Sequence, residues 1–335
     1  MIRQGLLALL FSMLLSSGLS SARADSFVER PEVQQFIETM ADRHGFDAEA
    51  LSHLFAQARP CLFAARTMTE QVAQPLPWSR YRSQFVNKRN IRHGVRFWRQ
   101  NATALARARR IYGVPEEVVV AIIGVETRYG KTRSRFPEFD TLATLAFDYP
   151  RRAEYFRGEL EQYLLLMREE RRDPLSAKGS FAGAMGIPQF MPSSYRSYAV
   201  DFNRDGRRDL WSSTTDAIGS VANYLKAYGW EAGQPVVVRV RLPDEAEQSL
   251  SAYVSTSLKP EWSVEELKSI GLVPVERLSA SLQAALLAVE GEDGREYWLG
   301  FDNFYAITRY NRSLHYALAV YQLSWEIRSA RRVGH

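Results

Sequence analysis

The sequence predicts a mainly α-helical protein with a small strand-containing subdomain towards its C-terminal end. From Pro31 to about Trp230, apolar residues recur at spacings of three and four, which is the period of an amphipathic helix. After Gly233 the pattern changes to the alternation of PVVVRVRLP, and Gly and Pro residues punctuate the next sixty positions. The length of 335 residues and the 46% hydrophobic content suit one large or two ordinary domains with a sizeable core.

The first 24 residues have the pattern of a cleaved secretory signal peptide. Arg3 precedes an apolar run from Leu6 to Leu15, and small residues lead to an A-R-A exit at positions 22–24. No later stretch approaches the roughly 20 apolar residues of a membrane span. The single cysteine, Cys61, is not placed to carry a lipid and allows no intrachain disulfide. We therefore expect a soluble protein in the periplasm, without a membrane anchor.

A helical domain is expected over residues 25–232. Its clearest helical segments are PEVQQFIETMADRHGF, AEALSHLF after Asp47, VPEEVVVAIIGVETRYG, and RRAEYFRGELEQYLLLMREE. Residues 233–300 form the expected strand-containing subdomain, with strands in PVVVRVRLP and EYWLGF. In the final segment, 301–335, LHYALAVYQLSWEIRSA predicts a helix that returns to the helical domain.

The net charge of +5 is a modest excess of cations, of which Arg3 and Arg23 belong to the leader. Such an excess suits an anionic polymer, either peptidoglycan with its peptide carboxylates or nucleic acid. The arginines are scattered along helical segments and are not gathered in one arm, which favours solvated helix faces. We expect no nucleic-acid partner.

Glu126 is the candidate catalytic residue. Its helix, VPEEVVVAIIGVETRYG, has almost no polar face between Pro115 and Gly130, which is typical of a helix buried on all sides. Burial raises the pKa of a carboxyl above its ordinary ~4.3, and a protonated carboxyl near neutral pH is what a general acid requires. A glutamate at the rim of a buried helix, paired with an arginine such as Arg128, would give the same pattern.

The segment GSFAGAMGIPQFMPSSY, from Gly179 to Tyr195, is the second candidate for the site. Its small residues allow close approach of backbone to a ligand, and Gln189 offers an amide. Pro192 and the serines after it are suited to begin a helix. The pattern is that of a sugar-binding subsite, although a tight packing contact between elements would look similar.

Five motifs in order resemble one known family. They are G-V-E-T-R-Y-G, F-D-Y-P-R-R-A-E-Y-F, G-A-M-G-I-P-Q-F-M-P-S-S, D-A-I-G-S-V-A-N-Y and I-T-R-Y-N-R-S-L-H-Y-A. Together they resemble the membrane-bound lytic murein transglycosylase B family, glycoside hydrolase family 103, in a soluble form. The resemblance covers nearly all of the chain after the leader. It implies a lysozyme-like α core flanked by additional helices and a small strand-containing domain.

The resemblance also implies the site and the reaction. The family's catalytic glutamate falls on Glu126, and its substrate-binding residues fall on Ser180, Gln189, Tyr224, Tyr310 and Tyr316, with Asn311 nearby. The family cleaves the MurNAc–GlcNAc β-1,4 bond of peptidoglycan glycan strands without water and forms 1,6-anhydro-MurNAc. Most glycosidases need two carboxylates. Only Glu126 is convincingly placed, so it would act as acid and then as base, while the substrate's N-acetyl group and 6-hydroxyl replace a protein nucleophile.

A loop at residues 201–216 has the spacing of an EF-hand. Side-chain oxygens stand at positions one, three, five and nine of the loop, and glycine stands at six. Position twelve, usually glutamate, is Ser212, so the loop is longer than usual and its closing ligand is expected to be Asp216. Catalysis needs no cofactor, and a bound Ca²⁺ would be structural. The expected ligands are Asp201, Asn203, Asp205, Arg207 through its carbonyl, Asp209 and Asp216.

Two alternative functions remain. A lysozyme-like hydrolase would use the same acid but water as the attacking group, and its product would be heavier by one water. A non-catalytic scaffold would bind the cell wall and recruit other enzymes. Other cell-wall enzymes are also conceivable partners of the transglycosylase, which we expect to be a monomer. The five histidines show no metal spacing, and no phosphate-binding loop is present in the sequence.

Overall fold

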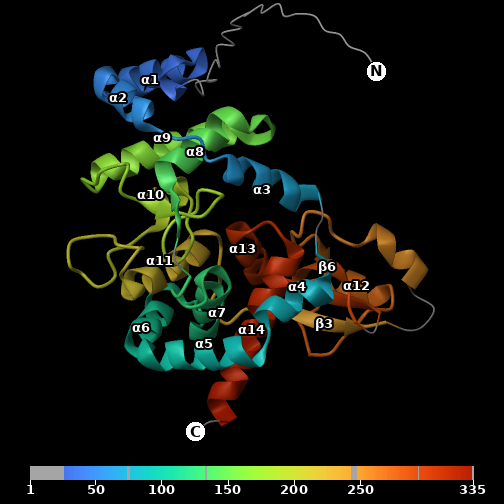
Figure 1. Ribbon diagram of the computed structural model, residues 1–335. Coiled ribbons are helices and arrows are strands. Elements are labelled where there is room, and N and C mark those ends of the chain that lie inside the picture. Colours follow the sequence, from blue (N-terminus) through green and yellow to red (C-terminus); the bar gives the residue numbers. More distant parts are fainter. Residues whose placement is uncertain (1–25, 74–75, 133, 243–246, 293, 334–335) are drawn as a thin grey trace, which may run out of the picture. The chain divides into compact units, whose positions relative to one another are not determined.

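The computed structural model describes residues 26–73, 76–132, 134–242, 247–292 and 294–333 (Figure 1). The signal peptide expected at residues 1–24 lies outside these ranges. In the part of the chain that is described, no helix is both long and apolar enough to cross a membrane. The chain divides into two compact units, Met1–Arg59 and Pro60–His335.

The first unit is a pair of helices with a short 3-10 turn before them. These elements are η1 (Phe27–Glu29), α1 (Pro31–His44) and α2 (Ala48–Gln57). Pro31 occupies the first turn of α1, and the helix closes at Gly45, whose φ of 62° lies in the left-handed region. The Asp47 carboxylate accepts the N–H groups of Glu49 and Ala50 at the start of α2, so the predicted cap is confirmed.

The second unit contains the remaining helices. They are α3 (Leu62–Ala73), α4 (Trp78–Phe85), α5 (Lys88–Gln100), α6 (Ala102–Tyr112), α7 (Glu116–Thr127), α8 (Glu138–Asp148), η2 (Pro150–Arg152), α9 (Ala153–Glu169), α10 (Pro192–Tyr198), α11 (Thr214–Ala227), η3 (Glu247–Ala252), α12 (Val264–Ser269), α13 (Asp302–Tyr310) and α14 (Leu314–Val333). The mainly helical fold class predicted from the sequence is therefore confirmed.

Helix α7 lies at the centre of this unit. Every residue from Val118 to Gly124 is buried, as the all-apolar pattern predicts. The helix packs against α5, α6, α11 and α14. It begins after Pro115 and ends at Thr127, three residues earlier than the expected cap at Gly130. Arg128 and Tyr129 already have left-handed φ values, because their N–H groups donate to carbonyls in the last turn of the helix.

The strand-containing part is a five-stranded antiparallel sheet in the order β4-β6-β7-β3-β5. The strands are β3 (Val237–Arg241), β4 (Trp262–Ser263), β5 (Val273–Pro274), β6 (Gln283–Glu290) and β7 (Arg295–Gly300). Its core covers one face of the sheet and is completed by aliphatic residues of the connecting segments and by Phe301. The strand residues of this core are Val238, Val240, Ala284, Leu286, Tyr297 and Leu299. The strands expected in PVVVRVRLP and EYWLGF are present, whereas the longest strand, β6, was not predicted.

A second, two-stranded sheet pairs β1 (Phe136–Pro137) with β2 (Lys178–Gly179). It lies within the segment predicted to be predominantly helical. Because β1 directly precedes α8 and β2 directly precedes Ser180, the pairing fixes the start of the Gly-rich segment to the base of α8. The small sheet therefore helps to position a candidate binding segment.

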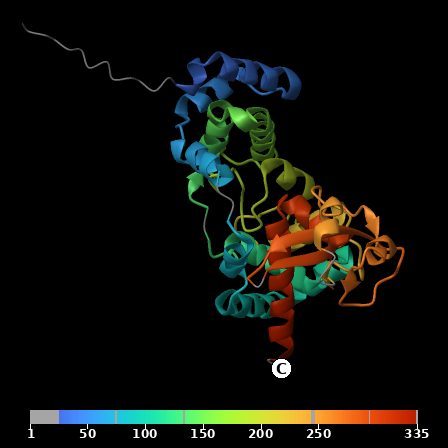
Figure 2. The ribbon, with the colours of Figure 1, turned by 90° about the vertical axis from the view of Figure 1, so that its right-hand side faces the viewer.

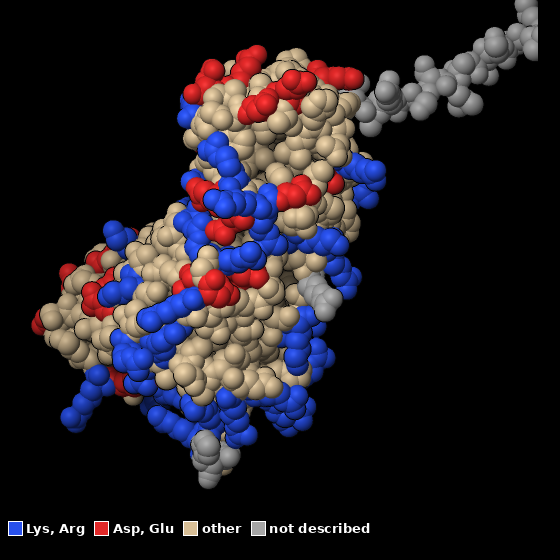
Figure 3. Space-filling view, turned by 90° about the vertical axis from the view of Figure 1, so that its left-hand side faces the viewer, with Lys and Arg blue, Asp and Glu red and all other residues tan. Residues whose placement is uncertain are grey.

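The C-terminal helix α14 returns to the helices, where it packs against α4, α5 and α7. Figure 2 shows α14 in red beside the orange strands. Basic side chains crowd the lower part of the face in Figure 3. Two surface hollows formed by α5, α6 and α14 are lined by Arg92, Arg96, Arg99, Arg109, Arg328, Arg331 and Arg332. The cations are thus more gathered than the sequence pattern indicated.

Candidate active site

Glu126 lies in the last turn of α7, where the helix leaves the buried core. Tyr316 of α14 donates its hydroxyl hydrogen bond to Glu126 Oε1 over 2.5 Å. Glu126 as a residue is partly open to solvent, as a group that meets a substrate must be, whereas Tyr316 is only 2% exposed. Within the described ranges Glu126 forms no ion pair, and Arg128 is exposed, so the pairing considered for these two residues does not occur.

The surroundings of Glu126 keep its carboxyl partly protonated at neutral pH. The carboxyl is enclosed by protein atoms, and this loss of solvation raises its pKa from 4.5 to about 7. The hydrogen bond from Tyr316 acts in the opposite direction and lowers the pKa, because it stabilises the charged form. The site therefore holds a group that can give a proton and take one back near pH 7.

A cluster of tyrosines adjoins Glu126. The ring of Tyr310 stacks 6.4 Å from that of Tyr316, and the ring of Tyr224 lies 4.8 Å from that of Tyr310. The hydroxyls of Tyr310 and Tyr224 donate to the carbonyls of Pro188 and Arg309, each over 2.6 Å. These bonds fix the ring orientations. Tyr224 and Tyr316 are 5% and 2% exposed, whereas Tyr310 is half-buried, so Tyr310 offers most of the ring surface that a ligand can reach.

Two further residues near Glu126 were missed from the sequence. Burial and the charge of Glu126 raise the pKa of Tyr81 to about 12, which places this α4 side chain in the field of the carboxylate. The ring of His315, next to Tyr316, lies 5.7 Å from that of Tyr81 and 5.5 Å from that of Trp78. Helix α4 carries no motif of its own, so nothing in its sequence indicated this position.

The Gly-rich segment packs on its own protein. A Cβ atom on Gly183 would lie 2.6 Å from Leu142 Cδ2, and one on Gly186 would lie 2.4 Å from the Leu210 carbonyl oxygen. The first interpretation of these glycines, close approach to a ligand, is therefore wrong at these positions. The alternative of tight packing holds, since both also have left-handed φ values that favour glycine.

Ser180 and Gln189 lie at the two ends of that segment. The Ser180 hydroxyl oxygen accepts the N–H groups of Ala182 and Ala184, which closes a tight turn. Gln189 has a φ of 52°, and its amide donates to the Gly186 carbonyl over 2.9 Å. Both side chains remain partly exposed. A left-handed non-glycine residue is strained, and such strain gathers at functional sites.

Thr127 connects this segment to the catalytic helix. Its hydroxyl donates to the Ile187 carbonyl over 2.8 Å and accepts the N–H of Gly130. Thr127 is 2% exposed and directly follows Glu126. The position of Gln189 relative to Glu126 thus depends on a residue that sequence reasoning did not single out. Asn311, by contrast, is exposed at the end of α13, between Tyr310 and α14.

A second buried carboxyl, Glu138, lies beneath the Gly-rich segment. It is fully buried, and neither carboxylate oxygen has a hydrogen-bond partner among the described residues. Burial, and then the charge of Glu159, raise its pKa well above the ordinary value. A Cβ on Gly179 would overlap Glu138 Oε2, so only glycine fits there. The charge of Glu138 acts on the pKa of Tyr163 in α9, whereas the charge of Glu126 raises the pKa values of Tyr310 and Tyr316.

The loop at 201–216 brings the first three predicted ligands together. The backbone N–H of Asp205 donates to Asp201 Oδ1 over 3.1 Å and to Asn203 Oδ1 over 3.0 Å, and Asp205 Oδ2 accepts the Asn203 amide over 2.8 Å, so the three side chains lie close together. No cation of the described chain pairs with Asp201 or Asp205. Arg207 donates its N–H to Asp205 Oδ1 over 3.0 Å.

The last two predicted ligands hold the loop's backbone. Asp216 is fully buried, and its carboxylate accepts the N–H groups of Phe202, Asn203 and Asp209. The Asp209 carboxylate accepts those of Trp211 and Ser212. Over the described ranges no group of three or more His, Cys, Asp and Glu side chains could by itself hold a metal. An ion in this loop would need amide and carbonyl oxygens as well.

Three comparisons relate the chain to known proteins. A family profile described as the transglycosylase SLT domain matches residues 28–325. The chain is 47% identical over 314 residues to the membrane-bound lytic murein transglycosylase B of Escherichia coli (strain K12), covering 91% of this chain and 85% of that protein.

Solved structures agree with that match. The Escherichia coli lytic transglycosylase Slt35 in complex with calcium has a TM-score of 0.83 and 48% identity, covering 91% of this chain and 95% of that one. SltB3 from Pseudomonas aeruginosa in complex with NAG-anhNAM-pentapeptide has a TM-score of 0.77 and 34% identity, covering 91% of this chain and 80% of that one.

Proposed function

The chain belongs to the transglycosylase SLT domain family, and from this premise we propose that it is a lytic transglycosylase that cleaves the MurNAc–GlcNAc β-1,4 bond of peptidoglycan. The observation that carries the proposal is Glu126, whose pKa burial raises to about 7 and whose carboxyl accepts a hydrogen bond from Tyr316, beside the ring of Tyr310. We assign it both proton transfers. The name of the Escherichia coli relative and the NAG-anhNAM-pentapeptide bound to SltB3 support the reaction class.

In the first step, protonated Glu126 donates its proton to the glycosidic oxygen. The bond between C1 of MurNAc and that oxygen breaks, and the GlcNAc hydroxyl leaves. The N-acetyl carbonyl oxygen of the same MurNAc bonds to C1 and holds the positive charge. The hydrogen bond from Tyr316 stabilises the Glu126 carboxylate as it forms.

In the second step, the Glu126 carboxylate takes the proton of the substrate's 6-hydroxyl. The oxygen of that hydroxyl bonds to C1 while the bond to the acetyl oxygen breaks, so a 1,6-anhydro ring closes. The attacking group is tethered to the reacting carbon, and this high effective concentration favours it over water. The pKa shifts of Tyr81, Tyr310 and Tyr316 support a one-carboxylate site, since among the described residues Glu126 is the carboxyl whose charge raises all three.

We assign the glycan contacts to the residues around this carboxyl. Tyr310, the most exposed of the three tyrosines, would stack on a sugar ring, and the nearly buried Tyr224 and Tyr316 would hold it in place. Ser180, Gln189 and Asn311, which are partly or fully exposed, would contact polar groups of the strand. Because the proposed substrate is peptidoglycan, the protein would act in the periplasm. The basic face in Figure 3 suits the carboxylates of the peptidoglycan peptides. Other cell-wall enzymes remain candidate partners.

We also propose that the loop at 201–216 binds a structural calcium ion, as Slt35 was solved with calcium. The closeness of the Asp201, Asn203 and Asp205 side chains supports three ligands, the Arg207 carbonyl would add a fourth, and Asp209 and Asp216 would close the loop. Calcium should raise the melting temperature of chelator-treated protein. Asp201→Asn should abolish that rise, whereas the exposed Asp42→Asn should keep it. An unchanged melting temperature with and without calcium would show that the loop works without an ion.

The test of the main proposal is the mass of the fragments released from purified peptidoglycan. The unaltered protein should release anhydro-muropeptides, and Glu126→Gln should release none. Fragments heavier by one water would identify a lysozyme-like hydrolase, and no release by the unaltered protein would leave only a binding role. Glu117→Gln, in the same helix but paired with Arg328, is the matched control and should stay active.

A further inference from the structure

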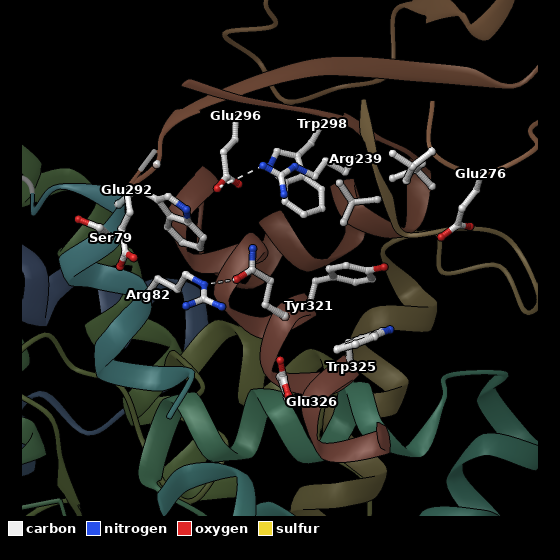
Figure 4. Close-up of a pocket in the computed structure, with 16 residues that line it drawn as sticks. Ser79, Arg82, Arg239, Glu276, Glu292, Glu296, Trp298, Tyr321, Trp325 and Glu326 are labelled. Carbon is white, nitrogen blue, oxygen red and sulfur yellow. Dashed lines mark hydrogen bonds and ion pairs between the residues drawn. The ribbon is translucent and has the colours of Figure 1, made fainter. Parts of the chain in front are cut away.

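A further concave surface lies between α4, α14 and the sheet (Figure 4). Its volume is about 540 Å³, within the roughly 300–1,000 Å³ common for ligand pockets. Tyr321 and Trp325 line it from α14, Arg82 from α4, and Arg239 and Trp298 from the sheet. We call this surface the α14 groove.

The α14 groove is separate from the site of Glu126. Tyr316 points to Glu126 from α14, and Tyr321 follows it by five residues and Trp325 by nine. At 3.6 residues per turn these positions lie roughly 140° and 180° around the helix from Tyr316. The groove and the catalytic carboxyl therefore face opposite sides of the same helix.

The aromatic wall of the groove is open to solvent at Trp325 and half-buried at Tyr321 and Trp298. Trp325 is 49% exposed, and Val275 on the facing side is 47% exposed. Tyr321 and Trp325 are four residues apart, and Figure 4 shows their rings projecting to the same side of α14. One helical turn, about 6 Å along the axis, separates them. Two ring surfaces at that spacing can each stack on one of two successive sugars of a strand.

The charged groups of the groove are only partly paired. Arg239 pairs with Glu296 at 3.7 Å, and Arg82 Nε donates to Gln322 Oε1 over 2.5 Å. Three further glutamates, Glu276, Glu292 and Glu326, have no ion pair or hydrogen bond within the described chain. Figure 4 shows Glu292 and Glu276 at opposite ends of the groove, with Glu326 at its lower edge. The free carboxylates surround the groove and do not converge on one point.

This arrangement selects among ligand classes. Four glutamates against two arginines disfavour an anionic group inside the groove, so the peptide carboxylates of a glycan strand would have to lie outside it. A single ammonium group would need the carboxylates to converge, and they do not. An extended, uncharged ligand with many hydroxyls fits both features, because its apolar faces can stack on the rings while its hydroxyls donate to carboxylates along the rim.

We propose that the α14 groove binds an N-acetylated β-1,4-linked oligosaccharide, that is, a second glycan strand held beside the one being cleaved. The identification of that strand with peptidoglycan rests on the proposed function, whereas the saccharide binding itself does not. A protein that holds two neighbouring strands stays on its insoluble polymer between cuts, since the second contact keeps the effective concentration of the substrate high.

Binding is tested with N-acetylchitotetraose and the Glu126→Gln protein by isothermal titration calorimetry. Two binding events are expected, one of which should disappear or weaken by about tenfold or more in the additional double variant Tyr321→Ala/Trp325→Ala. Ile111→Ala, which removes an exposed apolar side chain of α6, is the control and should keep both. Identical titrations for the double variant and its parent would overturn the proposal.

A charge-neutral variant separates a sugar from an amine. Glu276→Gln/Glu292→Gln keeps hydrogen-bond acceptors but removes two charges, so saccharide binding in the groove should change by less than about threefold. A loss of tenfold or more, or competition by a lysine-containing peptide, would identify the groove as a site for a cation and refute the saccharide. If the charge-neutral variant still shows both saccharide-binding events, the result supports a saccharide site.

The kinetic consequence is tested on two substrates. With the double aromatic variant, KM for insoluble peptidoglycan should rise several-fold, while kcat for a soluble tetrasaccharide fragment should stay. A loss of activity on both would place the two rings in the fold of the catalytic site and refute a separate groove. If the unaltered protein cleaves neither substrate, the proposed function fails, and the calorimetry alone still decides the groove.

Discussion

Replacing Glu126 by glutamine should make the protein more stable at neutral pH, and the size of the effect follows from the pKa. In the native protein the pKa is raised from 4.5 to about 7, so the unfolded chain loses this proton at lower pH than the native one. Stability therefore falls as pH rises from about 4.5 to about 7. The difference corresponds to at most about 3 kcal/mol, at about 1.36 kcal/mol per pKa unit.

Glutamine keeps the shape and can accept the Tyr316 hydrogen bond, but it never ionises. The two proteins should thus have nearly equal free energies of unfolding at pH 4, and Glu126→Gln should be more stable by up to about 3 kcal/mol at pH 8. Urea unfolding at a series of pH values, followed by fluorescence, measures this. Glu117→Gln, outside the site but in the same helix, is the control. A difference between the proteins that does not change with pH would refute the desolvation of Glu126.

Three other substitutions test neighbouring contacts. Tyr316→Phe should raise the pKa of Glu126 by roughly one or more, since a hydrogen bond to a charged group contributes about 1.5–3 kcal/mol. The alkaline limb of the kcat–pH profile should then move to higher pH. A shift to lower pH would contradict the view that Tyr316 stabilises the Glu126 carboxylate. Thr127→Val should lose about 1–3 kcal/mol of stability, because it leaves the Ile187 carbonyl unpaired. The variant should show a lower urea midpoint and a higher KM. An unchanged KM would show that the Gly-rich segment around Ile187 does not contribute to substrate binding. Glu138→Met should raise the free energy of unfolding by about 1–3 kcal/mol at pH 7, because it removes a buried carboxyl that has no hydrogen-bond partner among the described residues. The melting temperature measures this, and a lower value would show that the carboxyl has a partner in solution.

Local patterns were sufficient where one element decides the outcome. The apolar run around Ile122 predicted a helix buried on all sides, and Asp47 predicted the start of α2. The alternation in PVVVRVRLP predicted β3. For the site, the position of Glu126 near a helix end followed from the helix itself, whereas Tyr224, Tyr310 and Tyr316 were found only through the family resemblance. Their spacing carries no signal of its own.

Contacts between distant segments could not be predicted in the same way. Strand β6, QAALLAVE, is rich in alanine and leucine, which favour helix, and it is extended because β4 and β7 pair with it on both sides. The early end of α7 depends on left-handed conformations at Arg128 and Tyr129 that glycine usually takes. Tyr81 and Thr127 owe their roles to partners far along the chain, so their own neighbourhoods show nothing unusual.

The hydrogen bond between Glu126 and Tyr316 joins residues 190 positions apart. A ribosome therefore produces the carboxyl long before its tyrosine, and the contact cannot form until α14 has been made. Any shortened polypeptide that stops before Tyr316 keeps the acid but lacks the group that stabilises its charged form. The proton affinity of Glu126 is therefore set only in molecules whose synthesis has reached α14.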